Sequence, residues 1–396
     1  MKHNLTGKGS KPMISYIFLF RRTLWVQKCF AAWIVCTLLT GCWDSREIDN
    51  LSIIQGVAID MDQQDMLELT YQHLIAQKSR KNMYSNVTTF NKDSIQSASR
   101  EQAKQVSRAP LYSFIRLILI SDQAIQKRRI DQLLDTFTRS YKPSRKSLVM
   151  IIKGNAKEAL NKIGKHQEIP SIDLEAMAKN SNLNSKIPYR ITLGEISTHI
   201  SQGADFLIQC LETNGGNHFS GAALVSGKTK KFAYWLDEED VIGINWMLGK
   251  TKGSIIRIES SKSNQSVVFE VEDVHTKLIP HLNGQDLSFT VRIKSDIKLN
   301  ESTVSSEDFL KESFIQTAKQ EAQDEIKQTV SQSLNTLQKE MRADVVGFGT
   351  KVKVKYPAYW DRVKENWQDT FSEIPINVKA KVQIERTGAY TKGEGE

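Results

Sequence analysis

The chain has 396 residues, of which 25% are charged and 40% are hydrophobic, a balance typical of folded domains that excludes both intrinsic disorder and a membrane protein with many spans. Its formal net charge is +9, but residues 1–41 carry six basic side chains and no acidic one, which leaves 48 basic and 45 acidic side chains, a net charge of +3, for the remainder. Because this remainder is nearly neutral, a nucleic-acid partner is not predicted.

Residues 1–41 are predicted to be a signal peptide. Basic side chains precede an apolar run, residues 29–40, and these 12 residues would span only about 18 Å as a helix, well short of the roughly 30 Å hydrocarbon core of a bilayer. A positive region followed by a short apolar region and small residues is typical of secretory signals. A second apolar stretch begins at Met13, so either Met1 or Met13 can be the translation start.

The apolar run ends in Leu39-Thr40-Gly41-Cys42, which resembles the lipobox of bacterial lipoproteins. Diacylglyceryl transfer needs an accessible thiol, and the signal peptidase needs small side chains beside the scissile bond. We therefore expect cleavage between Gly41 and Cys42, with S-diacylglycerol and N-acyl groups on Cys42. Two acyl chains hold a protein stably on a bilayer, so the mature chain is expected on the outer face of the cell membrane. A plain uncleaved anchor is the alternative.

The remaining cysteine is predicted to be structural. Cys29 and Cys36 would leave with the signal peptide and Cys42 would be acylated, so that Cys210 is the last free thiol. One thiol cannot form an internal disulfide, and no Cys-x-x-Cys spacing offers a metal site. Cys210 is expected to be a small core residue on a strand.

Residues 42–203 are predicted to form an α/β region, with a softer boundary near residues 164–185 that would divide it into two subdomains. The expected strands are residues 53–60 and 67–76, which form a hairpin, and residues 116–121 and 147–152. Five helices are expected. The first is capped by Asp93 or Ser94 and reaches about residue 108, the second is capped by Asp122 and reaches residue 137, and the third is capped by Asn155 and reaches about residue 163. The other two cover residues 171–180 and 192–201, and the last has Thr192 and Glu195 at capping-box spacing. Two of the strands are apolar throughout, which predicts a helix-covered and at least partly parallel sheet.

Residues 204–396 are predicted to form a C-terminal α+β domain. The expected strands are residues 205–212, 218–226, 231–236, 254–259, 266–278, 287–300 and 376–386. A helix over residues 240–248 is expected between the cap Asp237 and Gly249, and apolar residues three or four apart predict one long amphipathic helix over residues 306–341 that packs against an antiparallel sheet. The alternating Lys and Val of residues 351–355 fit either a strand or a helix that ends at Pro357. Residues 360–371 place their apolar side chains on one helical face. The predicted fold class is thus α+β, multi-domain, with mixed sheets each packed with helices.

No catalytic, metal or cofactor site is predicted. Two Gly-Lys-Thr triplets, at Gly227 and Gly249, lack the first glycine of a phosphate-binding loop and are interpreted as turns. The acidic run Asp237–Asp240 is expected at a helix N-terminus, where the macrodipole favours carboxylates; a metal cluster is the alternative. A basic patch is left with two interpretations, a solvated face or a contact with anionic lipid head groups. Its residues are Lys351, Lys353, Lys355, Arg362 and Lys364.

The sequence Cys42-Trp-Asp-Ser-Arg-Glu-Ile48, followed by a strand that ends in Gly56-Val-Ala-Ile-Asp60, resembles the Ger(x)C family, the C subunits of spore germinant receptors. Three later stretches agree in the same order, so the resemblance covers the chain from residue 39 to about residue 388. They are Phe114-Ile-Arg-Leu-Ile-Leu-Ile-Ser121; Trp235-Leu-Asp-Glu-Glu-Asp-Val-Ile-Gly243 with Trp246-Met-Leu-Gly-Lys250; and Gly347-Phe-Gly349 to Tyr356-Pro-Ala-Tyr-Trp360 with Glu385-Arg-Thr-Gly388.

The resemblance implies a non-enzymatic lipoprotein, without cofactor, of three α+β domains, anchored on the outer face of the spore inner membrane. Such a protein would assemble with a membrane-embedded A subunit and a transporter-like B subunit to trigger germination when a nutrient binds. The implied lipid attachment site is Cys42, and the membrane-proximal motif is Trp43, Asp44, Arg46 and Glu47, which we expect to order the chain above the bilayer because an indole suits the interface. The alternatives are an extracytoplasmic solute-binding lipoprotein, which the absence of duplicated halves disfavours, and a surface hydrolase, for which no nucleophile spacing is present.

Overall fold

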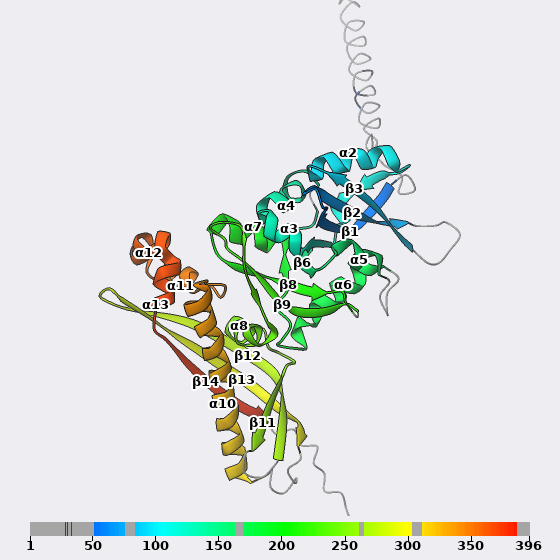
Figure 1. Ribbon diagram of the computed structural model, residues 1–396. Coiled ribbons are helices and arrows are strands. Elements are labelled where there is room, and N and C mark those ends of the chain that lie inside the picture. The colour runs from blue at the N-terminus through cyan, green and yellow to red at the C-terminus, as the bar shows by residue number, and fades with distance from the viewer. Residues whose placement is uncertain are drawn as a thin grey trace, which may run out of the picture. The chain divides into compact units, whose positions relative to one another are not determined.

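The computed structural model describes residues 51–75, 84–141, 143–162, 169–214, 216–260, 265–302 and 311–385, together with Lys28, Phe30 and Trp33. It divides the chain into two compact units, Met1–Leu51 and Ser52–Glu396. All labelled helices and strands in Figure 1 belong to the second unit, apart from the first residue of β1.

Ten strands of the described residues form a first sheet. Eight of them follow in the order β10-β9-β8-β6-β5-β1-β2-β3, while β4 pairs with β1 and β7 pairs with β6. The neighbours β1, β5, β6 and β8 are parallel, and the pairs towards both edges are antiparallel. The strands are β1 (Leu51–Met61), β2 (Leu67–Ile75), β3 (Tyr84–Lys92), β4 (Ala109–Leu111), β5 (Leu117–Ser121), β6 (Leu148–Lys153), β7 (Ile191–Thr192), β8 (Phe206–Glu212), β9 (His218–Val225) and β10 (Phe232–Leu236).

The helices between these strands begin at side chains that can cap them. Ser94 and Asn155 each accept a backbone N–H of their helix, and Thr192 and Glu195 form the expected capping box. The helices are α2 (Ile95–Gln105), α3 (Asp122–Lys127), α4 (Ile130–Thr136), α5 (Ala156–Asn161), α6 (Pro170–Lys179) and α7 (Leu193–Gln202), with the short turns η2 (Tyr112–Phe114), η3 (Phe137–Tyr141) and η4 (Asn180–Asn182).

The centre of the first sheet is apolar on both faces. All five residues of β5 are buried, and so are the first five of β6. One face packs against α2, α3, α4 and α7, and the other packs against α5 and α6 (Figure 1). Since strands that are apolar on both faces need cover on both sides, the prediction of a helix-covered, partly parallel sheet is confirmed.

The helix expected after Asp122 differs from the prediction in two ways. Ser121 is the N-cap, with its hydroxyl accepting a backbone N–H at 3.3 Å, and Asp122 is the first helical residue. The helix then breaks at Arg128, which is extended, and the N–H of Ile130 donates to the carbonyl of Lys230 at 2.9 Å. A tertiary contact with the β9–β10 turn therefore divides the helix into α3 and α4.

No hydrophobic pattern in the sequence predicts β3. Its residues are mostly Ser, Asn and Thr, with Phe90 the one fully apolar side chain that is buried. The strand forms because it pairs with β2 along its whole length, where Thr70 and Thr89 bring their hydroxyls within 3.0 Å. Cross-strand pairing here outweighs local propensity.

Four strands of the described residues form a second sheet in the order β11-β12-β13-β14. The first three are antiparallel, whereas β14 joins β13 in parallel. A parallel neighbour needs a long crossover connection, and the helices that precede β14 supply it. The strands are β11 (Ile255–Ser260), β12 (Gln265–Asn283), β13 (Asp286–Ser302) and β14 (Ile376–Glu385).

The longest helix, α10 (Glu312–Asn335), lies across the second sheet and contacts β14 (Figure 1). It continues into a π-helical turn, η5 (Thr336–Met341). The prediction of a long amphipathic helix on this sheet is confirmed, while residues 303–310 lie outside the described residues. Its buried apolar side chains keep the expected spacing: Ile315, Ala318, Ala322, Ile326, Val330 and Leu334.

Shorter helices complete this part of the molecule. They are α8 (Glu238–Leu248), capped by Asp237 and ended by Gly249 as expected, α11 (Phe348–Lys355), α12 (Pro357–Val363) and α13 (Trp367–Glu373), with the turn η6 (Lys364–Asn366) between the last two. Of the two alternatives for residues 351–355, the helix is correct. The single helical face expected over residues 360–371 is divided between α12 and α13, whose Trp360 and Trp367 rings still lie 5.2 Å apart.

Strand β9 contributes to two cores. Its Ala223 and Val225 pack with the first sheet, whereas Ala222 and Leu224 pack with the residues of the second sheet and α10, because successive side chains of a strand point to opposite faces. Strands β8, β9 and β10 belong to the first sheet although they follow residue 203. The division into residues 42–203 and 204–396 stays a prediction.

Candidate functional site

The predicted lipid attachment site and its motif are not among the described residues. Cys42, Trp43, Asp44, Arg46 and Glu47 all lie in a stretch outside them. Acylation of Cys42, cleavage after Gly41 and the role of the motif therefore stay predictions. The described residues show instead what the later stretches of the family resemblance do.

A polar junction, which we call the Asp205–Asp344 junction, joins the first sheet to the C-terminal helices. Asp205 precedes β8, is buried, and accepts the backbone N–H of Gly227 at 3.0 Å. The backbone of Asp344 and the side chain of Gln368 lie near enough to this carboxyl to lower its pKa, but burial has the larger effect and raises the pKa of Asp205. The carboxylate of Asp205 is thus close to three segments that are distant in sequence.

Asp344 organises the turn that begins α11. Its Oδ1 accepts the N–H groups of Gly347 and Phe348 at 2.8 and 2.9 Å, and its Oδ2 accepts the N–H of Gly349 at 2.7 Å and the indole N–H of Trp367 at 3.0 Å. Gly347 has a φ of +93°, in the left-handed region that favours glycine. A Cβ on Gly349 would lie 2.9 Å from the Trp367 ring. The Gly-Phe-Gly stretch is therefore a carboxylate-bound turn.

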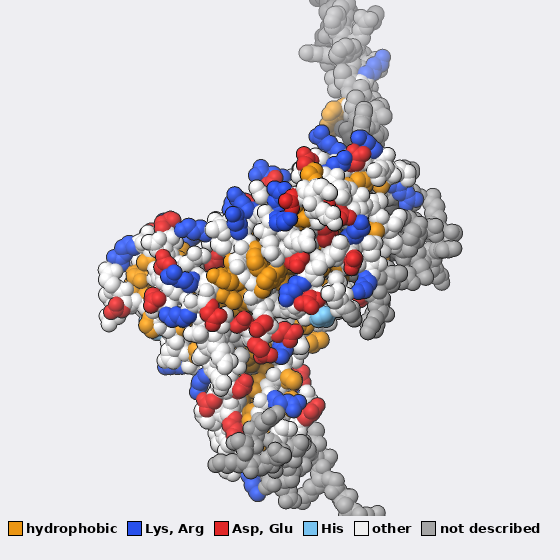
Figure 2. Space-filling view, in the orientation of Figure 1, with side chains coloured by type: hydrophobic (Ala, Val, Ile, Leu, Met, Phe, Trp, Pro, Cys, Tyr) orange, Lys and Arg blue, Asp and Glu red, His pale blue; other side chains and the backbone are white. Residues whose placement is uncertain are grey.

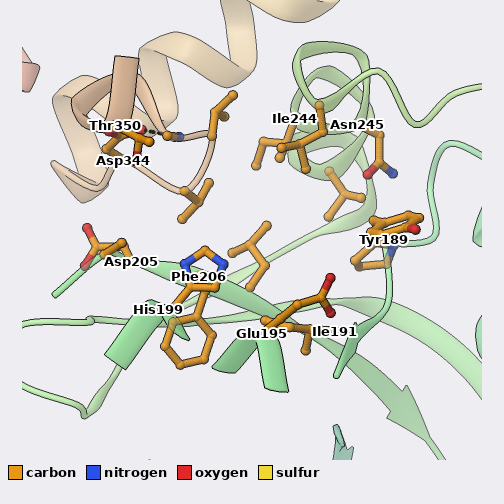
Figure 3. A pocket seen from close by; sticks show the side chains of 18 of the residues that line it. Tyr189, Ile191, Glu195, His199, Asp205, Phe206, Ile244, Asn245, Asp344 and Thr350 are labelled. Carbon is orange, nitrogen blue, oxygen red and sulfur yellow. Dashed lines mark hydrogen bonds between the residues drawn. The ribbon is translucent and has the colours of Figure 1, made fainter. Parts of the chain in front are cut away.

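A cavity of about 190 Å³ lies beside this junction. It is enclosed by α7, β8, α8 and the segment from Asp344 to Thr350 (Figure 3). In this view His199 and Asp205 lie on the same side of the cavity as Glu195, with Asp344 across from them. Burial lowers the pKa of His199, and its Nδ1 has no hydrogen-bond partner among the described residues. The imidazole is thus held neutral in a partly apolar space.

A larger hollow of about 660 Å³ adjoins this cavity and shares Asp205 and Asp344 with it. The rings of Trp360 and Trp367 contribute to its lining, together with the β9–β10 turn. Lys228 of that turn donates to the carbonyl of Glu365 at 3.0 Å, so a hydrogen bond links the turn to η6.

The chemistry available at the junction is hydrogen bonding. Asp205 and Asp344 are both engaged by N–H donors, several of them from the backbone. The thiol of Cys210 lies on β8, fully buried as expected, and burial raises its pKa. Within the described residues, no group of three or more His, Cys, Asp or Glu side chains is placed to hold a metal ion. The junction fits a structural role.

Helix α8 carries another stretch of the resemblance, and its residues also serve packing. A Cβ on Gly243 would lie 2.6 Å from the carbonyl oxygen of Thr329 and 2.7 Å from the Cβ of Ser333, both on α10. Asn245 donates to the carbonyls of Ser185 and Ile187 at 2.8 and 2.9 Å. Gly243 therefore allows close packing of α8 against α10, and Asn245 binds α8 to the segment that contains Ser185 and Ile187.

Acidic side chains gather over the beginning of α8 (Figure 2). Asp237 caps the helix by accepting the N–H of Asp240 at 2.9 Å. Lys186 pairs with Glu239 at 2.6 Å and with Glu238 at 3.9 Å. The cap and the position in the first turn agree with the macrodipole interpretation.

The first stretch of the resemblance places a buried carboxylate as well. Asp60, at the end of β1, accepts the N–H groups of Ala156 and Lys157 at 2.7 and 2.9 Å and so caps α5. Burial raises the pKa of Asp60 to about 6. Gly56 lies against α5 and α6, where a Cβ would be 3.0 Å from both Leu160 and Ser171.

The comparisons with known proteins follow the same order along the chain. Residues 44–213 match the family described as "Spore germination protein N-terminal domain", and residues 220–388 match "Spore germination B3/ GerAC like, C-terminal". The chain is 30% identical over 389 residues to "Spore germination protein YndF" of Bacillus subtilis (strain 168), covering 90% of this chain and 96% of that protein. The chain belongs to the Ger(x)C family of spore germination proteins. The resemblance inferred from sequence is thereby confirmed, and the germination proteins of this family are non-enzymatic.

Two further similarities agree with this membership. "Spore germination protein B3" of the same organism is 26% identical over 363 residues, covering 89% of this chain and 96% of that protein. The crystal structure of the GerBC protein covers 86% of this Ger(x)C chain and 100% of its own, with a TM-score of 0.58 at 22% identity, which shows a shared fold. Among the helices that the structure describes, none is both long enough and apolar enough to cross a membrane.

Sequence reasoning missed the two carboxylates of the junction. Asp344 stands three residues before Gly347, and this spacing is a usable signal because Asp side chains often accept backbone N–H groups two or three residues ahead. Asp205 offered no such signal, since its partners lie in distant segments.

Proposed function

We propose that this Ger(x)C protein is the lipid-anchored C subunit of a nutrient germinant receptor. In this proposal, acylated Cys42 holds the chain on the outer face of the membrane, and the folded part binds a membrane-embedded A subunit and a B subunit. The observation that carries the proposal is a family relationship along almost the whole chain, combined with a lipobox at Leu39–Cys42.

The short distance along the chain between Cys42 and β1 supports a role of the anchor in holding the first sheet close to the membrane. Eight residues separate Cys42 from Leu51, and a fully extended chain of that length spans at most about 29 Å. Leu51 begins β1, which lies between β2 and β5 in the interior of the first sheet. Chain ends that are tied into a sheet are ordered, in contrast to most termini. An anchor at Cys42 would therefore restrain the first sheet directly, through its interior strand β1.

The described residues support a binding subunit over a solute-binding lipoprotein. The two sheets that the structure describes differ in strand number and order, whereas a two-lobed solute-binding protein would consist of two similar halves. The residues of the family stretches that lie in the described parts fasten internal turns and helices. The surface is thus left for partner proteins.

The first test replaces Cys42 by alanine in the full chain. Without the thiol no diacylglyceryl group can be attached, so the precursor should stay uncleaved and the germination response to nutrient should fall. Mass spectrometry of the N-terminal peptide and a germination assay measure the two effects. A Cys42→Ala chain that is processed normally would contradict the anchor.

A second experiment tests the partners. Crosslinking in membranes followed by mass spectrometry of the complexes recovered with this chain should yield peptides joined to the A and the B subunit. If neither subunit is joined to the chain, its assignment as a receptor subunit is wrong.

A further inference from the structure

Positive charge is concentrated in one stretch of the mature chain. Residues 92–146 carry 12 basic and 5 acidic side chains, a net charge of +7, whereas the chain from residue 42 onward has a net charge of only +3. The other parts of the mature chain are therefore negative in sum. The fold determines whether these basic side chains lie together on one surface.

One group of these residues lies at the end of the first sheet where the chain enters it. The chain reaches β1 at Leu51, and β5 and β6 begin at the same end, because all three strands are parallel neighbours. The N–H of Arg116 donates to the carbonyl of Gln55 at 2.9 Å, and the N–H of Leu148 donates to the carbonyl of Arg116 at 2.8 Å. Residues just before β5 and β6 therefore share one edge with the start of β1.

Five residues at this edge form what we call the tether-end patch: Arg108, Phe114, Arg116, Arg145 and Lys146. Arg108 precedes β4, which pairs with β1 and lies in the segment that leads to η2 and Arg116. Arg116, Arg145 and Lys146 are exposed. The patch thus lies at the end of the first sheet at which β1 begins.

Phe114 is the apolar member of the patch, and 54% of its surface is exposed. It lies in η2, a turn fixed by its neighbours: buried Ile115 donates to the carbonyl of Tyr112 at 3.2 Å and accepts the hydroxyl of Ser147 at 2.6 Å. Core packing does not account for a phenyl ring that is exposed on a turn fixed by its neighbours.

Acidic side chains near the patch are already engaged. Glu175 pairs with Arg116 at 3.0 Å and with Lys179 at 2.9 Å. Glu195 accepts hydrogen bonds from Thr192 within the capping box of α7. The acidic groups on α2 and α4 are paired as well: Glu101 with Lys92 and Lys104, Asp131 with Arg129 and Lys230, and Asp135 with Arg139.

Arg108 and Lys146 form no ion pair within the described residues, and Arg145 spends one guanidinium nitrogen on the carbonyl of Gly194 at 3.0 Å. Guanidinium and ammonium groups that are not neutralised by the protein can bind phosphate oxygens strongly. The patch therefore retains positive charge for an external anion.

We propose that the tether-end patch lies on the anionic head groups of the bilayer that holds Cys42, with Phe114 inserted at the interface; this rests on the proposed lipid anchor. Basic residues near an anionic bilayer bind its surface electrostatically, and an aromatic ring is favoured at the head-group level. The tether provides the argument for a bilayer as the occupant, because no more than eight residues separate the acylated cysteine from β1. The patch then fixes which side of the first sheet faces the membrane.

The experiment uses the mature, acylated chain with Ser113→Cys, an exposed position beside Phe114, labelled with an environment-sensitive fluorophore. The label is specific, because Cys210 is buried and Cys42 would be acylated. The chain is placed on vesicles of phosphatidylcholine alone or mixed equally with phosphatidylglycerol. Contact predicts blue-shifted emission and quenching by a bilayer-borne quencher on the anionic vesicles, reversed at high salt.

Two double variants with the same change in net charge test whether bilayer contact depends on the tether-end patch or only on the net charge of the chain. Arg108→Glu with Lys146→Glu should lower the ratio of bilayer-contacting to free label about fivefold for each positive charge removed. Lys351→Glu with Lys353→Glu, on α11, should leave this ratio unchanged. A label at Val354→Cys, 79% exposed on α11, should stay in a water-like environment on both vesicles.

The outcomes distinguish the patch from the anchor. Acyl groups found by mass spectrometry without contact at residue 113 would overturn the patch and leave the anchor in place. Equal loss with both charge pairs, or contact at residue 354 in place of residue 113, would also overturn it. A mature chain that carries no acyl group would contradict the proposed function, while contact at residue 113 on anionic vesicles would still support the patch.

Discussion

Buried aspartates hold several of the backbone turns in this molecule. Asp60 accepts two backbone N–H groups at the start of α5, and Asp344 accepts three at the start of α11. The first N–H groups of a helix have no partner within it, so a carboxylate placed there satisfies donors that would otherwise be buried unbonded. The cost is the desolvation of a charge, which raises the pKa of Asp60 and makes the stability of its turn depend on pH.

Asp60 predicts such a pH dependence. Its folded-state pKa of about 6 lies above the unfolded value of 3.8, so the folded chain binds this proton more tightly than the unfolded chain does. The contribution to stability is therefore fully present below pH 3.8 and is lost as the pH rises through about 6. The free energy of unfolding of the native chain should fall by about 3 kcal/mol relative to Asp60→Asn over this range, as measured by urea unfolding at several pH values.

The comparison with Asp60→Asn is needed because His73 acts in the opposite direction. Burial lowers the pKa of His73 from 6.5 to about 4, so its contribution is present above pH 6.5 and is lost as the pH falls through about 4. His73 lies between the hydroxyls of Ser52 and Thr88 at 2.6 and 2.7 Å and is unchanged in both chains. A difference between the chains that does not vary with pH would show that the pKa of Asp60 is not raised.

At the scale of elements, the sequence predicts those whose pattern is local. The apolar strands β5 and β6, the capping box of α7 and the stripe of α10 all follow from residues within each element. The elements it did not predict depend on distant partners: β3 forms on β2, and the break before α4 depends on Lys230. The parallel pairing of β14 likewise depends on the crossover through α10 to α13.

Helices α8 and α10 provide a prediction about close packing. Gly243→Ala places a Cβ 2.6 Å from the carbonyl oxygen of Thr329, which is backbone and cannot rotate away. The helices must move apart, so a loss of about 1–3 kcal/mol in the free energy of unfolding is expected. Urea unfolding of the two chains measures this loss.

A double variant tests the cause of that loss. Ser333→Ala removes the hydroxyl next to Gly243 but leaves the Cβ of residue 333 and the carbonyl of Thr329 in place. Gly243→Ala combined with Ser333→Ala should therefore recover only part of the lost stability. Full recovery would mean that the hydroxyl alone, and not the backbone of α10, sets the distance between the helices.

At the scale of the whole molecule, sequence identified the family but not how its residues act. The stretches that carry the resemblance were recognisable as sequence, yet their roles are three-dimensional: Gly349 lies against Trp367, and Asp205 meets Gly227, Asp344 and Gln368. No periodicity relates these positions, since they come from different elements. The Asp205–Asp344 junction can therefore be recognised only from the three-dimensional arrangement of the first sheet and the C-terminal helices.

This junction predicts that the C-terminal helices depend on a single side chain. Asp344→Ala leaves the N–H groups of Gly347, Phe348 and Gly349 and the indole of Trp367 without their acceptor. Buried donors that lose their partner cost about 1–3 kcal/mol each at most sites, so a loss of several kcal/mol and faster amide exchange in α11–α13 are expected. Hydrogen-exchange mass spectrometry measures the second effect.

Asp369→Ala is the matched control, because Asp369 is exposed on α13 and pairs only with Arg342, at 2.7 Å, among the described residues. Exposed ion pairs contribute little, so exchange in α11–α13 should stay as in the native chain. If both variants changed exchange equally, the C-terminal helices would depend on surface charge and not on the buried carboxylate. If Asp344→Ala alone accelerated exchange, the buried carboxylate of Asp344 would be what holds the C-terminal helices in place.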